Sequence, residues 1–153
     1  MKSLYESLLD DFDTIASKID PEDTIIQYLQ ANYFGCKKEY VEMKLGEDGK
    51  YIVNLYNDLT PRKIKLKEIT NGMFVFGVIR GSVDFEGTQI SSLEGSPREV
   101  QGFFDCSYCP NLKSLKGGPK MVDGAFYCTN CGKQFKEKDI MNAKIIVQGG
   151  INI

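Results

Sequence analysis

Hydrophobic residues at the start of the chain recur with a helical period. Over residues 3–19, apolar side chains are spaced three or four positions apart, and Ser3 with Glu6 matches a capping box. Asp20 then suits the N-cap of a second helix, with proline at the first helical position. The pattern therefore predicts a helical hairpin over residues 1–35.

The hydrophobic period changes to two after these helices. Residues 41–45 and 51–55 alternate between apolar and polar side chains and flank a glycine-containing turn, which is typical of an antiparallel β-hairpin. Shorter strands are expected at 63–67 and 74–78. We assign residues 36–80 to this β-hairpin lead-in.

One sequence pattern then occurs nearly three times. The segment from Gly102 to Cys109 returns 22 residues later, from Gly124, and an earlier copy begins at Gly81, 21 residues before Gly102. Self-similarity at such a period is typical of a solenoid, in which each coil lays a short strand beside the previous one. The sequence therefore predicts stacked repeats over residues 81–135.

The segments between the repeated strands carry Gly-x-Pro, at 95–97 and again at 117–119, which predicts turns rather than helices on the outer side. Residues 136–153 are expected to cap the solenoid with a short helix and a closing strand at 144–147, followed by a Gly149-Gly150 tail. The expected fold class is α+β: a helical hairpin, a β-hairpin, a short β-solenoid and a C-terminal cap.

Composition adds few constraints to this picture. Of 153 residues, 42% are hydrophobic, which is enough for a core, and a net charge of −2 gives no overall attraction to nucleic acid or anionic membranes. No apolar run approaches the roughly 18 residues of a membrane span, and early acidic residues do not fit a signal peptide. Five cysteines, an odd number, favour a reducing compartment. A cytosolic protein is expected.

Two Cys-x-x-Cys motifs have the spacing of a zinc site with four thiolate ligands. The repeat favours another interpretation, because Phe85 occupies the first cysteine position in the earliest copy and Thr88 the second, and a phenylalanine cannot replace a metal ligand. We expect the cysteines to fill the core with no cofactor. Zinc remains the alternative, with these ligands: Cys106, Cys109, Cys128 and Cys131.

Stacking also places the cysteines of neighbouring coils close together. Adjacent strands lie about 4.8 Å apart, so Cys106 is expected beside Cys128, and Cys109 beside Cys131. Oxidation is expected to cross-link such pairs.

Catalytic signals are weak in this chain. It contains no histidine, which excludes histidine-dependent triads and two-histidine zinc motifs, and its acidic residues fall mostly on predicted helix surfaces and caps. The glycine-rich run at 116–120 lacks the Lys-Ser/Thr ending of a phosphate-binding loop. The lysines of segment 63–67 suit a protective strand edge. We expect neither an enzyme nor a nucleic-acid-binding protein.

Outward positions of the stacked strands should form one surface, and repeat proteins usually bind partners there. This surface combines aromatic side chains with an acidic rim and includes Ser107. The alternative is that the N-terminal helices or another subunit cover it. The predicted protein-binding residues are Asp84, Glu86, Phe103, Asp105, Tyr127 and Thr129.

Several segments resemble small leucine-rich-repeat-like proteins of tailed bacteriophages and prophages of gut bacteria. They are SLEGSPREV at 92–100, FFDC at 103–106 and FYCTNCGKQF at 126–135, and the opening MKSLYESLLDD is similar to a leader shared among such proteins. The segments at 88–90 and 109–112 match the two loop forms of a leucine-rich repeat. The resemblance implies a binding scaffold located in the host cytoplasm or the virion. It carries no catalytic residue over.

Three functions are therefore in competition. The first is a non-enzymatic protein–protein interaction module that binds a host or virion protein through the repeat face, the N-terminal helix, or both. The second is a zinc-dependent nucleic-acid-binding protein that uses the four-cysteine site and nearby lysines. The third is a virion structural or cargo protein. The sequence does not decide the oligomeric state.

Overall fold

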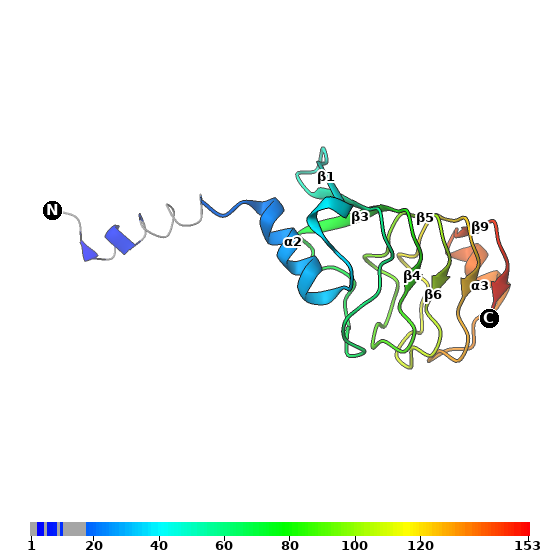
Figure 1. Ribbon diagram of the computed structural model, residues 1–153. Helices are drawn as coiled ribbons and strands as arrows, with labels where there is room; N and C mark the ends of the chain where they lie inside the picture. The colour runs from blue at the N-terminus through cyan, green and yellow to red at the C-terminus, as the bar shows by residue number, and fades with distance from the viewer. Residues whose placement is uncertain (1–2, 5, 9, 11–17) are drawn as a thin grey trace.

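The computed structural model describes residues 3–4, 6–8, 10 and 18–153. It is an α+β fold with few helices, in which a mostly parallel sheet stacks as a β-solenoid of about five turns (Figure 1). The helices are α2 (Pro21–Asn32), the 3₁₀ helix η1 (Lys38–Tyr40) and α3 (Glu137–Asn142). The strands are β1 (Val41–Leu45), β2 (Tyr51–Leu55), β3 (Phe74–Ile79), β4 (Val83–Asp84), β5 (Glu99–Val100), β6 (Phe104–Asp105), β7 (Met121–Val122), β8 (Phe126–Tyr127), β9 (Ile146–Val147) and β10 (Ile151–Asn152).

Helix α2 forms where the sequence predicts the second helix. Asp20 is its N-cap, and the Asp20 Oδ1 accepts the backbone N–H of Glu22 at 2.9 Å. The capping box of the first predicted helix is present too, because Ser3 N–H donates to Glu6 Oε2 at 2.8 Å and Glu6 N–H donates to Ser3 Oγ at 3.1 Å. The rest of that helix, and so the helical hairpin, lies outside the described residues.

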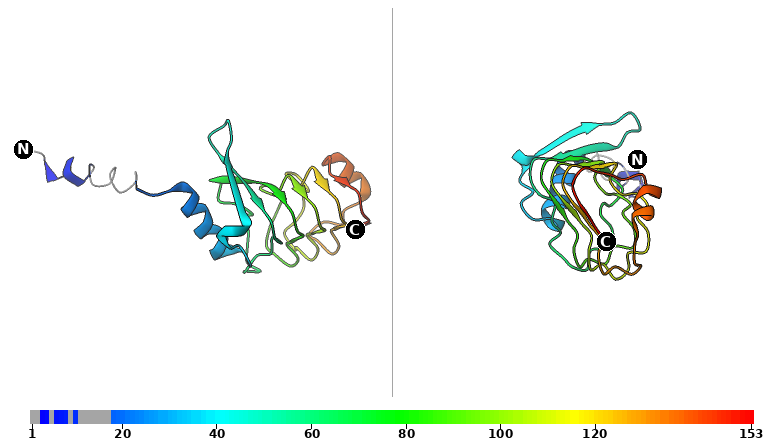
Figure 2. Two further views of the ribbon diagram at one scale, coloured as in Figure 1. Left: turned by 45° about the horizontal axis from the view of Figure 1, so that its top comes forward. Right: turned by 90° about the vertical axis from the view of Figure 1, so that its right-hand side faces the viewer.

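Two sheets run along the solenoid. The order of the six-stranded sheet is β1-β2-β3-β5-β7-β9, and that of the four-stranded sheet is β10-β8-β6-β4. The pairing of β1 with β2 is antiparallel, which confirms the β-hairpin, and every other pairing is parallel. From β3 onward each coil contributes one strand to each sheet, so the coils stack side by side (Figure 2).

The strand register confirms the repeat spacing. Val83 pairs with Phe104, and Phe104 pairs with Phe126, at the offsets of 21 and 22 residues expected from the sequence. These three side chains are fully buried, and the Phe104 and Phe126 rings stack with centroids 5.4 Å apart. The apolar column therefore runs through the core and joins successive coils.

A column of glycines lines the corner between the two sheets. The N–H of Gly102 donates to Gly81 O at 2.9 Å, and Gly124 and Gly149 continue the ladder at 3.0 and 3.1 Å. A Cβ on Gly124 would lie 2.6 Å from the Gly102 carbonyl oxygen, so only glycine lets the coils approach this closely. This contact explains why the repeat begins with glycine.

The chain ends in a further coil rather than in the predicted tail. Strand β9 pairs with β7, as expected for the closing strand, but Gly149 then leads into β10, which pairs with β8. The offset from Met121 to Ile146 is 25 residues because α3 is inserted in this coil. Because of this insertion the last coil does not follow the period of 21 or 22 residues, so the sequence pattern does not identify it as a repeat.

The prediction of a strand at 63–67 is wrong. Leu66 N–H donates to Lys63 O at 3.1 Å, so the segment turns, and Gln89 N–H donates to Leu66 O at 2.9 Å. Strands β2 and β3 pair directly, which leaves no place between them for another strand. The lysines of this segment therefore do not share a strand face.

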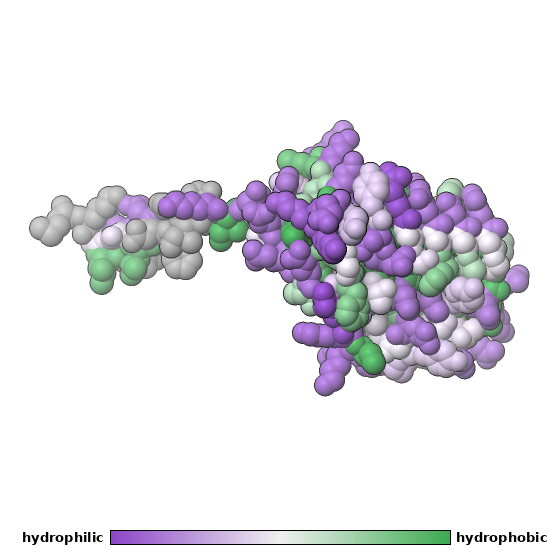
Figure 3. All heavy atoms as spheres, viewed as in Figure 1, coloured by the Kyte–Doolittle hydropathy of each residue, from purple (hydrophilic) through white to green (hydrophobic). Residues whose placement is uncertain are grey.

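The outer segments between coils contain turns, as predicted. Gly95 and Gly117 adopt φ values of +87° and +80°, which glycine accepts without strain. Among the described residues, no helix has the length and apolar character needed to cross a membrane. In the view of Figure 3, hydrophilic side chains predominate around α2, whereas paler and more hydrophobic ones gather over the coils.

Candidate protein-binding face and cysteine columns

The four-stranded sheet places the predicted surface residues in rows. Asp84 pairs with Asp105, and Asp105 pairs with Tyr127, so their side chains form one row across β4, β6 and β8. Asn152 of β10 pairs with Tyr127 and extends this row. The sequence did not indicate Asn152 because its coil was not recognised as a repeat.

Three carboxylates come together beside this row. The oxygens of Asp84, Glu86 and Asp105 all lie within 4.8 Å of one another. Asp84 Oδ1 accepts the N–H of Glu86 at 3.0 Å, and Asp105 Oδ1 accepts the N–H of Ser107 at 2.8 Å, which orients both aspartates. Such a group of oxygens suits a hard cation or the basic side chain of a partner.

An aromatic pair lies next to the carboxylates. Phe103 is 40% exposed, and its ring meets that of Tyr127 edge-on with centroids 6.1 Å apart. Ser82 Oγ accepts the N–H of Phe103 at 3.1 Å and so holds the start of this strand against the preceding coil. The pair offers apolar area with little conformational freedom left to lose on binding.

Ser107 is the exception on this face, because it is buried rather than outward. Its Oγ accepts the N–H of Thr129 at 3.2 Å, so its side chain lies along the stack and links two coils. Thr129 itself is half-buried. All six predicted binding residues lie on β4, β6 and β8 or on the turns beside them, and the described residues leave Phe103 and Glu86 exposed.

A hollow of about 330 Å³ adjoins the acidic residues. Asp84 and Glu86 line it together with Lys63 and Ile64, and Ile64 is 71% exposed. Segment 63–67 turns instead of forming a strand, which brings this apolar side chain to the edge of the face. Sequence reasoning missed Ile64 because it assigned the segment to a strand.

The cysteines occupy two inward columns. Cys106, Cys109 and Cys128 are buried, as expected, whereas Cys131 is half-buried, and all are free thiols. Cys109 Sγ donates to Phe85 O at 3.1 Å, and Cys131 Sγ donates to Cys106 O at 3.2 Å. Cysteine thus offers the same kind of donor as Thr88, whose Oγ1 donates to Phe85 O at 2.9 Å.

The surroundings of these thiols favour the protonated form. Burial raises the pKa of Cys106 and Cys109. The hydrogen bond with Cys106 raises the pKa of Cys128, and the hydrogen bond with Cys128 raises that of Cys131. Metal binding would require these thiols to lose their protons and their carbonyl contacts.

The sulfur contacts include one predicted pair and one that the stacking did not predict. Cys131 Sγ lies 3.7 Å from Cys128 Sγ within its own coil. Cys106 is also hydrogen-bonded to Cys128 of the next coil, as the stacking predicts. Cys109 Sγ lies 3.5 Å from Thr88 Oγ1 of the preceding coil. Among the described residues, the four sulfurs do not converge on one point, whereas the three carboxylates do.

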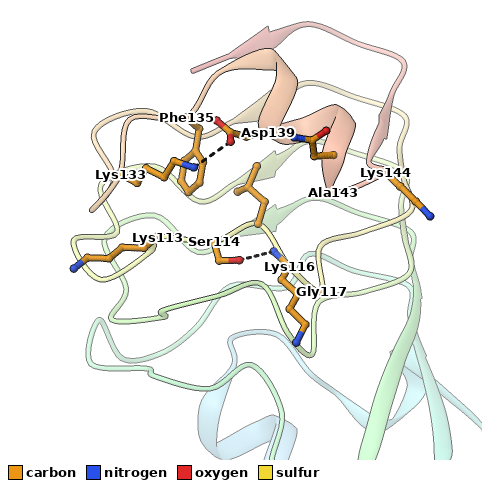
Figure 4. Close-up of a pocket in the computed structure, with 11 residues that line it drawn as sticks. Lys113, Ser114, Lys116, Gly117, Lys133, Phe135, Asp139, Ala143 and Lys144 are labelled. Atoms are coloured by element: carbon orange, nitrogen blue, oxygen red, sulfur yellow. Dashed lines mark hydrogen bonds and ion pairs between the residues drawn. The ribbon is translucent and has the colours of Figure 1, made fainter.

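A basic hollow of about 390 Å³ lies near the C-terminal end (Figure 4). Lys133 pairs with Asp139 at 3.1 Å across its opening, and two of its other lysines, Lys113 and Lys144, have no acidic partner in the described part of the chain. Lys116 also lines it and pairs with a glutamate outside the hollow. The lysines come from two segments, 113–116 and 133–144, and the sequence indicated only Lys116, within the glycine-rich run at 116–120.

Comparisons of the chain with protein-family models, with curated proteins and with solved structures find no match.

Proposed function

We propose that this chain is a non-enzymatic protein-interaction module whose solenoid face binds a basic patch of a protein partner. The observation that carries the proposal is that two unlike features adjoin on one face: three carboxylates lie within 4.8 Å of one another, and one of them, Asp105, pairs in register with Tyr127 of the Phe103–Tyr127 pair. Aromatic side chains are enriched among residues that contribute most to binding, and charged rims steer association.

The neighbouring residues support a partner with both basic and apolar side chains. Ile64 adds apolar surface beside Asp84 and Glu86, so an arginine or lysine on the acidic cluster brings its aliphatic stem against apolar surface. The acidic cluster contributes most to the association rate, and the aromatic pair contributes most to the lifetime of the complex.

The resemblance to leucine-rich-repeat-like phage proteins supports a host or virion protein as the partner. The N-terminal segment is a second candidate contact in the same proposal. Leu4 and Leu8 are exposed among the described residues of that segment, and an amphipathic helix commonly docks through such side chains.

The test is affinity capture from phage-infected bacteria with the immobilised chain. We expect the double variant Phe103→Ala/Tyr127→Ala to lose the partner recovered by the wild type. Tyr40→Ala is the matched control, because Tyr40 is 39% exposed, nearly as much as Phe103, but lies outside this face. Deletion of residues 1–19 tests the N-terminal contact separately.

A second double variant tests the role of the acidic residues. Asp84→Asn with Asp105→Asn should weaken capture and reduce its dependence on salt, since exposed charges act mainly through long-range attraction. Retention of the same partner by both double variants and by the deletion would refute the proposal.

A zinc-dependent nucleic-acid-binding protein is the competing function, and the lysines of the basic hollow are the observation that favours it. Metal analysis of protein purified without chelator, together with thiol titration, separates the two. Stoichiometric zinc with four protected thiols would support the competitor. Metal-free protein that keeps its fold after chelation would eliminate it.

A further inference from the structure

The two Cys-x-x-Cys motifs have the same spelling but different surroundings. In the second motif the Sγ atoms of Cys128 and Cys131 are 3.7 Å apart, whereas in the first motif Cys106 and Cys109 make no mutual sulfur contact among the described residues. Cys109 is held instead by Phe85 O and Thr88 Oγ1 of the preceding coil. One motif therefore has its thiols in contact and the other does not.

The second motif is also the accessible one. Cys131 is half-buried and lines an open hollow of about 370 Å³ together with Asn130 and Gln134. Cys109 is fully buried. A small disulfide-containing molecule thus has a route to Cys131 but not to its counterpart in the first motif.

We propose that Cys128 and Cys131 are a reversible modification site that forms an intramolecular disulfide by exchange with a low-molecular-weight disulfide such as oxidised glutathione. The hydrogen bond with Cys128 raises the pKa of Cys131, so the exchange proceeds through the small ionised fraction of this thiol and is slow. That thiolate attacks one sulfur of oxidised glutathione, which gives a mixed disulfide and releases one glutathione thiolate. The thiolate of Cys128 then attacks the Cys131 sulfur, forms the Cys128–Cys131 bond and releases the second glutathione. The two protein thiols lose two electrons and two protons, and oxidised glutathione gains both.

Oxidation removes a hydrogen bond between the coil of β8 and the preceding coil. Cys131 Sγ donates to Cys106 O at 3.2 Å, and this donor disappears when the thiol proton leaves. The carbonyl oxygen of Cys106 then lacks that partner, and an unpaired buried acceptor is destabilising. The disulfide form should therefore open more readily between the coil of β6 and the coil of β8.

The experiment equilibrates the full chain with mixtures of reduced and oxidised glutathione, blocks free thiols with iodoacetamide in denaturant so that buried thiols react too, and maps the peptides by mass spectrometry. We expect one linked pair, Cys128–Cys131, with loss of alkylation at both, while Cys106 and Cys109 remain alkylated. Because this mapping uses the unmodified chain, it needs no variant to fold. Recovery of both thiols after reductant is added shows reversibility.

Two variants test whether the link is specific to the second motif. Cys131→Ser should abolish the link, and Cys109→Ser, the matching change in the first motif, should leave it intact. A link between Cys106 and Cys128, equal oxidation of both motifs, or a glutathione adduct on Cys131 that never closes would each overturn the proposal.

Discussion

At the scale of single residues, the turn after each strand of the four-stranded sheet shows how one backbone geometry accepts different side chains. Gly87 has a φ of +71°, and the residues at the same position in the next two coils are Tyr108 at +55° and Asn130 at +52°. Glycine and asparagine tolerate this left-handed region, whereas tyrosine is strained there. Tyr108 is therefore the least favourable residue in this column.

Replacing Tyr108 with asparagine should stabilise the protein. We expect a gain of about 0.5 kcal/mol in the free energy of unfolding, since part of the left-handed strain is relieved. Urea denaturation measures the change. Tyr40→Asn is the control, because Tyr40 is also exposed but has a negative φ, and it should give no gain.

Cys36 makes the free energy of unfolding depend on pH in the alkaline range. Burial raises the pKa of this thiol from 9.0 to about 11, despite the opposing effect of Arg62. The folded state therefore keeps a proton that the unfolded state releases, so this contribution to stability is complete below pH 9 and is lost as the pH rises through about 11. Denaturation curves across this range should fall less steeply for Cys36→Ala than for the wild type. An unchanged slope would contradict the assignment.

At the scale of the structural elements, the glycine corner sets the separation of neighbouring coils. Gly81, Gly102, Gly124 and Gly149 bring backbone against backbone, and each of the last three donates its N–H to the carbonyl oxygen of the glycine before it. The strands of the four-stranded sheet have only two residues each, so this corner supplements short ladders. The repeated glycine is thus a packing requirement and not a flexible joint.

Gly124→Ala should be clearly destabilising, by about 1–3 kcal/mol, because the added Cβ would lie 2.6 Å from a carbonyl oxygen of the preceding coil. Gly150→Ala is the matched control one position after the corner, where a Cβ meets nothing within 4 Å. Thermal or urea unfolding of the two variants measures the difference. Equal stability of the two would show that the coils adjust to the extra atom.

At the scale of the whole molecule, the described part of the solenoid has unequal ends. Helix α2 covers the N-terminal end, where Ile25 and Leu29 join the same core as Val53, and the Tyr28 and Phe74 rings meet at 5.7 Å. Each coil contacts mainly its neighbours, so a defect at one end spreads only through successive interfaces. The C-terminal coil contains α3 but leaves Ile146 and Ile151 exposed.

Leu29→Ala should therefore destabilise the N-terminal end of the solenoid more than the rest. We expect a loss of about 2–5 kcal/mol from the cavity left under α2. Hydrogen exchange should show the largest loss of protection in β2 and β3 and the smallest in β7 and β8. Gln27→Ala, an exposed change on the same helix, should leave the exchange pattern unaltered. Uniform loss of protection would indicate that the whole solenoid unfolds as one unit.

Much of the solenoid follows from the sequence alone, because its information is local and repeated. The positions of Val83, Phe104 and Phe126 predict one inward column, and the register confirms it. The helix signal at Asp20 and the alternation over 41–55 likewise identify α2 and the β-hairpin. Each of these patterns reports which side of its own segment is buried, and the period reports which segments stack.

The contacts that polar side chains make were decided only by the tertiary structure. Ser107 is buried because its hydroxyl accepts an N–H from the next coil, and Cys131 contacts Cys128 although its position in the repeat suggests a partner one coil away. The insertion of α3 hides the fifth coil from any search at constant period. The sequence by itself determined the period and the buried columns, because burial repeats with each coil. The structure decided which polar groups meet, because that depends on hydrogen bonds and side-chain directions that no repeat pattern records.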